Sequence, residues 1–176
     1  MAHKIKIYKT ANIEFSEYLK ESIEKITPGT DIFVEGYLTS LLSKFLSKEE
    51  DFLSEEPLIY RLTNSKNLED YIHLGDETLF ITGFYPEIML KKKNKKYVEN
   101  IGRTSYKEAA IMMGYEAQGK IYLVLANKFP LYSDVLNDVK YNLLENVNDK
   151  EFFELYKISK DYKNPRAIKK LEELVK

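Results

Sequence analysis

The residues best suited to chemistry gather in the range 71–106, where carboxylates, tyrosines and an arginine interrupt a mostly apolar stretch. Arg103 is one of three arginines among 27 basic residues, and an arginine in a lysine-rich chain indicates a need for the planar guanidinium fork. In a functional interpretation, Arg103 converges on the carboxylates Asp76, Glu77 or Glu87, or binds an anionic ligand. The candidate ligand-binding residues are Asp76, Glu87, Tyr97, Arg103 and Tyr106.

The same residues also have a structural interpretation, which we favour. Asp76 follows Gly75 and is expected to be the N-cap of a helix over 77–85, because aspartate accepts hydrogen bonds from exposed helical N–H groups. Arg103 would then hold a helix end or a buried carboxylate. The neighbours of Arg61 and Arg166 place both of these arginines on the surface.

Two patterns in this range are shared with other proteins. Residues 75–86 read Gly-Asp-x-x-Leu-Phe-x-x-Gly-Phe-x-Pro, and residues 102–106 read Gly-x-x-x-Tyr. In these patterns the chain resembles a group of uncharacterised bacterial proteins. The resemblance covers a small part of the chain and implies no activity.

Several classes of active site are disfavoured by composition. The chain has no cysteine and two histidines, His3 and His73, which excludes disulfide frameworks, thiol catalysis and histidine-rich metal sites. Ser105 could serve as a nucleophile for His73, but no strand–turn–helix elbow surrounds it. We therefore expect no catalytic residues, no metal and no cofactor, and we lean against an enzyme.

The run Lys91–Lys96 is the main cluster of like charge. It could contact phosphate groups of a nucleic acid or an acidic partner. The formal net charge of the whole chain is −1, however, and a solvated loop between helices is the favoured interpretation.

Length and composition indicate one globular domain over 1–176. The chain has 176 residues, of which 44% are hydrophobic and 31% are charged, enough for a core. The longest nearly uncharged stretch, 78–90, is too short to span a membrane, and residues 1–7 lack the apolar core of a signal peptide. We expect a cytoplasmic protein, whose lysine and glutamate content fits either a thermophile or an AT-rich genome.

Apolar residues recur with helical spacing along most of the chain, which predicts an all-α single-domain bundle of seven to nine helices. Residues 1–10 are expected to form an extended arm. Short helices should follow Ser47 and Pro57. A further turn or two is expected at 68–75, and the short apolar run 121–126 could be a strand or a buried helix, of which we favour the helix. The other helical segments are expected at 12–26, 30–45, 77–85, 97–115, 131–143, 152–158 and 165–175.

Two glycines occur inside helical patterns, Gly83 and Gly102. Glycine in a helix interior costs about 1 kcal/mol relative to alanine, so each needs a reason. We expect their helices to be antiparallel neighbours that cross closely at the glycines. A ligand lying against the bare backbone is the functional alternative.

These observations leave three hypotheses for function. The first is a non-catalytic helical binding or assembly module, which could be a homodimer, with no membrane partner. The second is a small-ligand-binding protein or an enzyme with a pocket around Asp76, Glu87 and Arg103. The third is a nucleic-acid contact through Lys91–Lys96.

Overall fold

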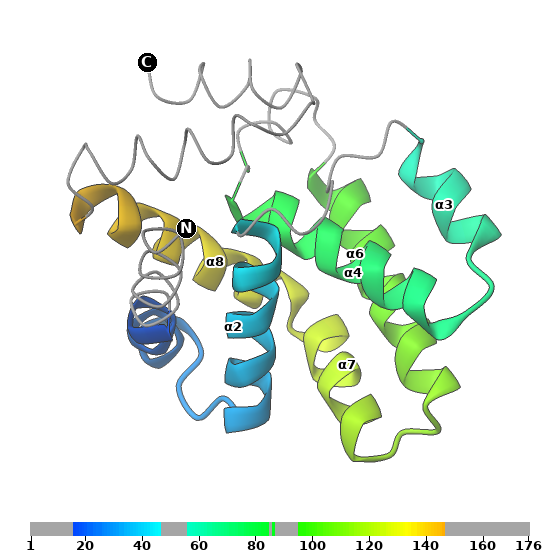
Figure 1. Ribbon diagram of the computed structural model, residues 1–176, viewed down its shortest axis with the longest axis horizontal. Helices are drawn as coiled ribbons and strands as arrows, with labels where there is room; N and C mark the ends of the chain where they lie inside the picture. Colours follow the sequence, from blue (N-terminus) through cyan, green and yellow to red (C-terminus); the bar gives the residue numbers. More distant parts are fainter. Residues whose placement is uncertain (1–15, 47–55, 85, 87–94, 147–176) are drawn as a thin grey trace, which may run out of the picture.

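The computed structural model describes residues 16–46, 56–84, 86 and 95–146 (Figure 1). Within these ranges every regular element is a helix and there is no strand, so the predicted all-α class is confirmed. A first helix covers residues 16–26. It is followed by α2 (Ile32–Leu46), α3 (Leu58–Asn64), α4 (Leu68–Phe84), α6 (Lys95–Met112), α7 (Ala117–Asn127) and α8 (Phe129–Asn146). The predicted arm over 1–10 and the helices predicted at 152–158 and 165–175 lie outside the described residues.

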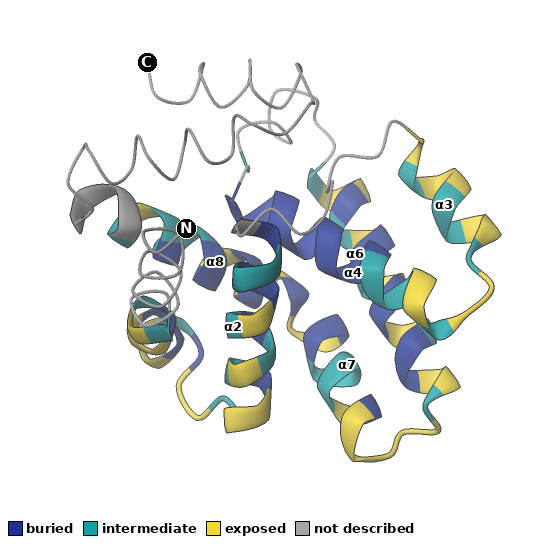
Figure 2. Cartoon of the chain, in the orientation of Figure 1, coloured by how far each residue is buried: buried dark blue, intermediate teal, exposed yellow. Residues whose placement is uncertain are grey.

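The centre of the fold is α4, which packs against α6 and α8 and also contacts α2 and α3 (Figure 1). All residues of α4 from Leu74 to Phe84 are buried, on every side of the helix (Figure 2). The hydroxyl groups of two threonines inside this stretch donate hydrogen bonds to backbone carbonyls of the same helix. Thr78 donates to the carbonyl of Leu74 at 2.7 Å, and Thr82 donates to that of Thr78 at 2.8 Å. The helix can therefore carry polar residues through the core.

The helix α4 is continuous through Gly75 and Asp76, so the predicted break at this point is wrong. A Cβ added at Gly75 would stand 2.7 Å from two ring carbons of Tyr106, in α6. Gly75 is thus where a buried ring packs against the helix backbone, and not a helix terminus. Asp76 correspondingly lies in the interior of α4 and is not an N-cap.

The helices α4 and α6 are antiparallel neighbours, as the sequence predicts. A Cβ at Gly102 would meet the Thr78 hydroxyl at 2.4 Å, while four residues later Tyr106 lies against Gly75. Contacts closer to the C-terminus of α6 are therefore made with residues closer to the N-terminus of α4. Gly83 behaves differently from the prediction, because a Cβ there would stand 2.5 Å from the Cβ of Leu136, in α8. The two glycines serve two different helix crossings.

The remaining helices enclose this centre. The rings of Phe45, Phe80 and Phe84 form a continuous stack between α2 and α4, with successive centroids 4.8 Å apart. The short apolar run predicted as helix at 121–126 lies within α7, and this prediction is confirmed. Gly114 has a φ of +67° in the turn between α6 and α7, a conformation that glycine adopts without strain. Among the described helices, none combines the length and the apolar character that crossing a bilayer requires.

Candidate functional site

Asp76 is a buried carboxylate that joins three helices. Its exposed fraction is 4%. Its Oδ1 accepts hydrogen bonds from the hydroxyl of Tyr37, in α2, at 2.5 Å and from that of Tyr106, in α6, at 2.9 Å. Its Oδ2 lies 3.7 Å from the Nζ of Lys44, also in α2. The carboxylate therefore has two neutral donors on one oxygen and a cation near the other.

This environment changes the acidity of the groups involved. Burial raises the pKa of Asp76 from 3.8 to about 6, because the charged form is desolvated. The hydrogen bond from Tyr37 and the charge of Lys44 act in the opposite direction and lower the pKa, as does the hydrogen bond from Tyr106. Burial, followed by the negative charge of Asp76, raises the pKa of both tyrosines well above 10.0. Both hydroxyl groups therefore stay protonated and remain donors.

A fourth helix reaches the same cluster through its aromatic ring. Tyr122, in α7, meets the ring of Tyr37 edge to face with centroids 5.5 Å apart, and stacks on Tyr106 at 6.0 Å. Burial and the charge of Asp76 also raise the pKa of Tyr122. The helices α2, α4, α6 and α7 thus meet around one carboxylate.

Glu77, the next residue along α4, has an exposed fraction of 2% and makes a separate ion pair. Its Oε2 lies 2.6 Å from a terminal nitrogen of Arg61, in α3, and 3.8 Å from the Nε2 of His73, one turn earlier in α4. The side chain of Arg61 is only 14% exposed, so its predicted place on the surface is wrong. The neighbours of Arg61 in the sequence did not show that α3 packs its one arginine against α4.

Helix geometry explains why adjacent residues have different partners. Successive side chains on an α-helix point about 100° apart, so Asp76 turns toward α2 and α6 while Glu77 turns toward α3. Each acidic side chain meets a cation from a flanking helix: Lys44 for Asp76 and Arg61 for Glu77. Two buried carboxylates consequently hold two cations on either side of α4.

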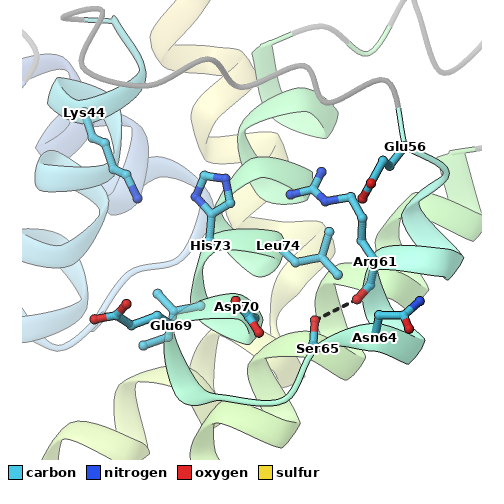
Figure 3. A pocket seen from close by; sticks show the side chains of 10 residues that line it. Lys44, Glu56, Arg61, Asn64, Ser65, Glu69, Asp70, His73 and Leu74 are labelled. Carbon is cyan, nitrogen blue, oxygen red and sulfur yellow. Dashed lines mark hydrogen bonds between the residues drawn. The ribbon is translucent and has the colours of Figure 1, made fainter.

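These cations border a cavity of about 600 Å³ between α2, α3 and the first half of α4. Figure 3 shows the imidazole of His73 between the ammonium group of Lys44 and the guanidinium group of Arg61. The other side chains around the cavity are mostly polar or acidic. The complete lining is Lys44, Glu56, Arg61, Asn64, Ser65, Glu69, Asp70, Ile72, His73 and Leu74.

The structure brings together two of the five residues singled out from the sequence. Asp76 and Tyr106 are hydrogen-bonded. Tyr97 is 41% exposed and accepts a hydrogen bond at 3.2 Å from the backbone N–H of Ile59, in α3. Glu87 lies outside the described residues. Among the four described residues of the predicted pocket, a hydrogen bond joins only Asp76 and Tyr106.

Arg103 does not approach Asp76. Its Nε donates a hydrogen bond of 3.2 Å to the carbonyl of Ala126, at the penultimate residue of α7. A cation there compensates the unpaired carbonyls of a helix C-terminus. Of the roles considered for Arg103, holding a helix end is the one that the geometry supports.

Sequence reasoning missed Lys44, Tyr37 and the pair of Arg61 with Glu77. Arginine is rare in this chain, and the argument that singled out Arg103 for this reason holds equally for Arg61. Tyr37 has the helical spacing of the apolar residues in α2, which by itself indicates only packing. No local pattern in the sequence predicts these pairings, because the partners are separated by 16 to 39 positions along the chain.

Other candidate chemistries find less support in the geometry. The hydroxyl of Ser105 is buried and donates to the carbonyl of Ile101 at 2.8 Å. The part of the chain that the structure describes has no group of three or more potential metal ligands. In the lysine run, Lys95 and Lys96 form the start of α6, Lys95 lies 3.7 Å from Glu99, and 91–94 fall outside the described ranges.

Comparison of the chain with protein-family models, with curated proteins and with solved structures returns no match.

Proposed function

We propose that this protein is a non-catalytic helical binding module that takes a small polar molecule into the cavity between α2, α3 and α4. The observation that carries the proposal is the arrangement of Lys44, His73 and Arg61 around this cavity, with the buried carboxylates of Asp76 and Glu77 behind them. A charged side chain is rarely buried unless it serves packing specificity or a site.

The dimensions and the rigidity of the cavity support binding. Its volume of about 600 Å³ falls within the range of small-molecule sites. Lys44 and Arg61 come from two different helices, and each lies beside a buried carboxylate that fixes its position. A preorganised site loses less side-chain entropy when a ligand binds.

A thermal-shift screen against a library of metabolites tests this proposal. A ligand that binds only the folded state raises the melting temperature, by several degrees when it is present far above its dissociation constant. Asn64 is exposed and lines the cavity, so Asn64→Trp should fill the cavity and abolish the shift.

Two control variants accompany the screen. Asn64→Ala also removes the hydrogen bond from Asn64 to the carbonyl of Tyr60 but leaves the cavity open, so it should retain binding. Thr104→Trp adds an equal bulk to an exposed position of α6 and should retain binding as well. No stabilising compound, or a shift that Asn64→Trp leaves intact, would show the proposal to be wrong.

Self-association is a second candidate function. Ile32 and Phe33, adjacent at the start of α2, are 72% and 71% exposed. Large adjacent apolar side chains on the surface are typical of contact sites. Sedimentation equilibrium should then show a dimer that the double change Ile32→Glu and Phe33→Glu converts to a monomer. A wild-type chain that stays monomeric at all concentrations would reject this candidate.

Nucleic-acid binding through Lys91–Lys96 is the lowest of the three candidates, since the net charge is −1. We expect no measurable complex with DNA or RNA at physiological ionic strength. A complex whose affinity falls steeply with salt, and which is lost when the lysines are changed to glutamine, would reverse this order.

A further inference from the structure

We propose that the outward face of α2 is a dimer interface, on which the α2 of a second copy of this chain lies antiparallel and crosses closely at Gly36. The inference rests on self-association, the second candidate function above, and adds the interface and its geometry. It is independent of the cavity between α2, α3 and α4.

The outward face of α2 carries exposed residues of two sizes. Ile32 and Phe33, at the start of the helix, are 72% and 71% exposed. Gly36 and Ser40, one and two turns after Ile32, are exposed as well. Figure 2 shows exposed segments at successive turns along α2, on the surface of the bundle. The face therefore has a large apolar end and an end made of small residues.

The two charged residues of α2 pair with other helices. The Oε1 of Glu35 lies 3.8 Å from the Nζ of Lys20, in the helix over 16–26, and the Nζ of Lys44 lies 3.7 Å from the Oδ2 of Asp76. The outward face of α2 thus bears no charge of its own, in a chain of which 31% is charged. Depletion of charged residues is typical of the core of a protein interface.

Gly36 has no packing reason within its own chain. A Cβ added at Gly75, Gly83 or Gly102 would collide with a side chain of a neighbouring helix, whereas one added at Gly36 would have no atom within 4 Å. Glycine nevertheless destabilises a helix interior relative to alanine. A second chain that approaches this backbone closely supplies the reason that the first chain lacks.

A second copy fits this face because the face is complementary to itself. In two antiparallel α2 helices related by a two-fold axis at Gly36, position 32 of one copy lies opposite position 40 of the other. The large side chain of Ile32 then covers the small Ser40 on both sides of the axis. The helix axes can approach below the usual distance of about 8–10 Å, because neither glycine has a Cβ. The Ser40 hydroxyl can donate to the carbonyl one turn earlier once water is excluded.

The size of the face indicates a reversible dimer. The helix α2 has 15 residues and is about 22 Å long. One pair of helices of this length buries less than the roughly 800 Å² per partner of a standard interface. Association should therefore be measured by sedimentation equilibrium from micromolar to millimolar concentrations.

Gly36→Leu separates a close crossing from a loose apolar contact. A Cβ at this position meets nothing in its own chain, so the variant should fold and be at least as stable as the wild type in urea melts of dilute samples. In the dimer the added side chain would stand between the two backbones, and it should raise the dissociation constant about tenfold or more.

Thr104→Leu, at an exposed position of α6, is the matched control and should associate as the wild type does. Unchanged or stronger association of Gly36→Leu would overturn the inference, because an added apolar side chain strengthens a loose contact.

Introduced cysteines test the antiparallel order, since the chain has none. When Ile32→Cys and Ser40→Cys chains are mixed and oxidised, disulfides between the two variants should exceed the yield expected from random pairing. Only opposed positions bring the Cα atoms within the roughly 4.4–6.8 Å that a disulfide spans. Random yields, or an excess of disulfides between identical chains, would show the antiparallel order to be wrong.

The outcomes distinguish this inference from self-association itself. If the wild type dimerises and the change of Ile32 and Phe33 to glutamate abolishes the dimer, but Gly36→Leu has no effect, self-association stands and the close crossing is wrong. If the wild type stays monomeric up to millimolar concentrations, both are wrong.

Discussion

The hydroxyl of Tyr106, in α6, donates a hydrogen bond of 2.9 Å to the carboxylate of Asp76, in α4, where both side chains are buried. The ring of the same tyrosine packs on Gly75, the residue before Asp76. A single side chain thus fills the space left by a missing Cβ and satisfies a carboxylate beside it. The patterns Gly-Asp and Gly-x-x-x-Tyr, which are separate in the sequence, meet here in space.

The stability of the protein should depend on the ionisation of Asp76. Its pKa is raised from 3.8 to about 6, so between these pH values the folded state binds more protons than the unfolded state. The free energy of unfolding must then fall as the pH rises through this window. Groups facing Asp76 are Tyr37 and Lys44 from α2, Tyr106 from α6 and Tyr122 from α7, with Glu77 adjacent on α4.

Asp76→Asn isolates this effect, because an amide oxygen can accept the same two tyrosine hydrogen bonds. The stability of the variant relative to the wild type should rise by about 2.5 kcal/mol between pH 4 and pH 8, because each pKa unit is worth roughly 1.4 kcal/mol and the unfolded state is already partly ionised at pH 4. Denaturant melts across this pH range measure it. A difference that is constant with pH would contradict the raised pKa.

Loss of either tyrosine hydroxyl should destabilise the protein more at pH 8 than at pH 5. Tyr106→Phe and Tyr37→Phe each remove a donor to the carboxylate, at a cost of about 1.5–3 kcal/mol when Asp76 is charged. Each change should also raise the pKa of Asp76 further, since both hydrogen bonds lower it. Chemical denaturation at the two pH values checks this, with the half-exposed Tyr141→Phe as a control expected to show no effect.

The two arginines of the described chain should differ in their contribution to stability. Arg61→Ala removes the cation 2.6 Å from buried Glu77 and should cost about 3–5 kcal/mol. Arg103→Ala removes one hydrogen bond to a carbonyl and should cost about 1 kcal/mol. Urea melts of both variants give the comparison.

A double variant tests the cause of the larger effect. Replacing the pair by Arg61→Met and Glu77→Leu should recover most of the stability, because no charge is then left buried. Equal losses of stability for Arg61→Ala and Arg103→Ala, or no recovery in the double variant, would contradict the assigned pairing.

Alanine substitutions at two helical glycines should have opposite signs. Gly102→Ala puts a Cβ 2.4 Å from both Phe129 and Thr78 and should destabilise by about 1–3 kcal/mol or more. Gly36, in α2, has no atom within 4 Å of an added Cβ, so Gly36→Ala should stabilise by about 1 kcal/mol through helix propensity. Thermal or urea melts decide both, and a neutral or stabilising Gly102→Ala would reject the close crossing.

The helices could be predicted because their signal is local. The spacing of apolar residues follows the helical period over α2, α6 and α8, and short-range propensity agrees with it. The break predicted at Gly75 fails for the opposite reason. A glycine followed by an aspartate has the same local pattern at a helix end and at a helix crossing, and only the ring of Tyr106 decides between the two.

The sequence by itself determined the all-α class, the places of most described helices, and the antiparallel crossing of α4 with α6 at Gly102. Tertiary structure alone decided which charges meet. Asp76 pairs with Tyr37 and Lys44, Glu77 with Arg61, and Arg103 with the end of α7. These partners are separated by 16 to 39 positions, and nothing in the local pattern of a charged residue records which distant helix it will face. That choice follows from how the helices pack, because packing sets which buried groups lose water and must find each other.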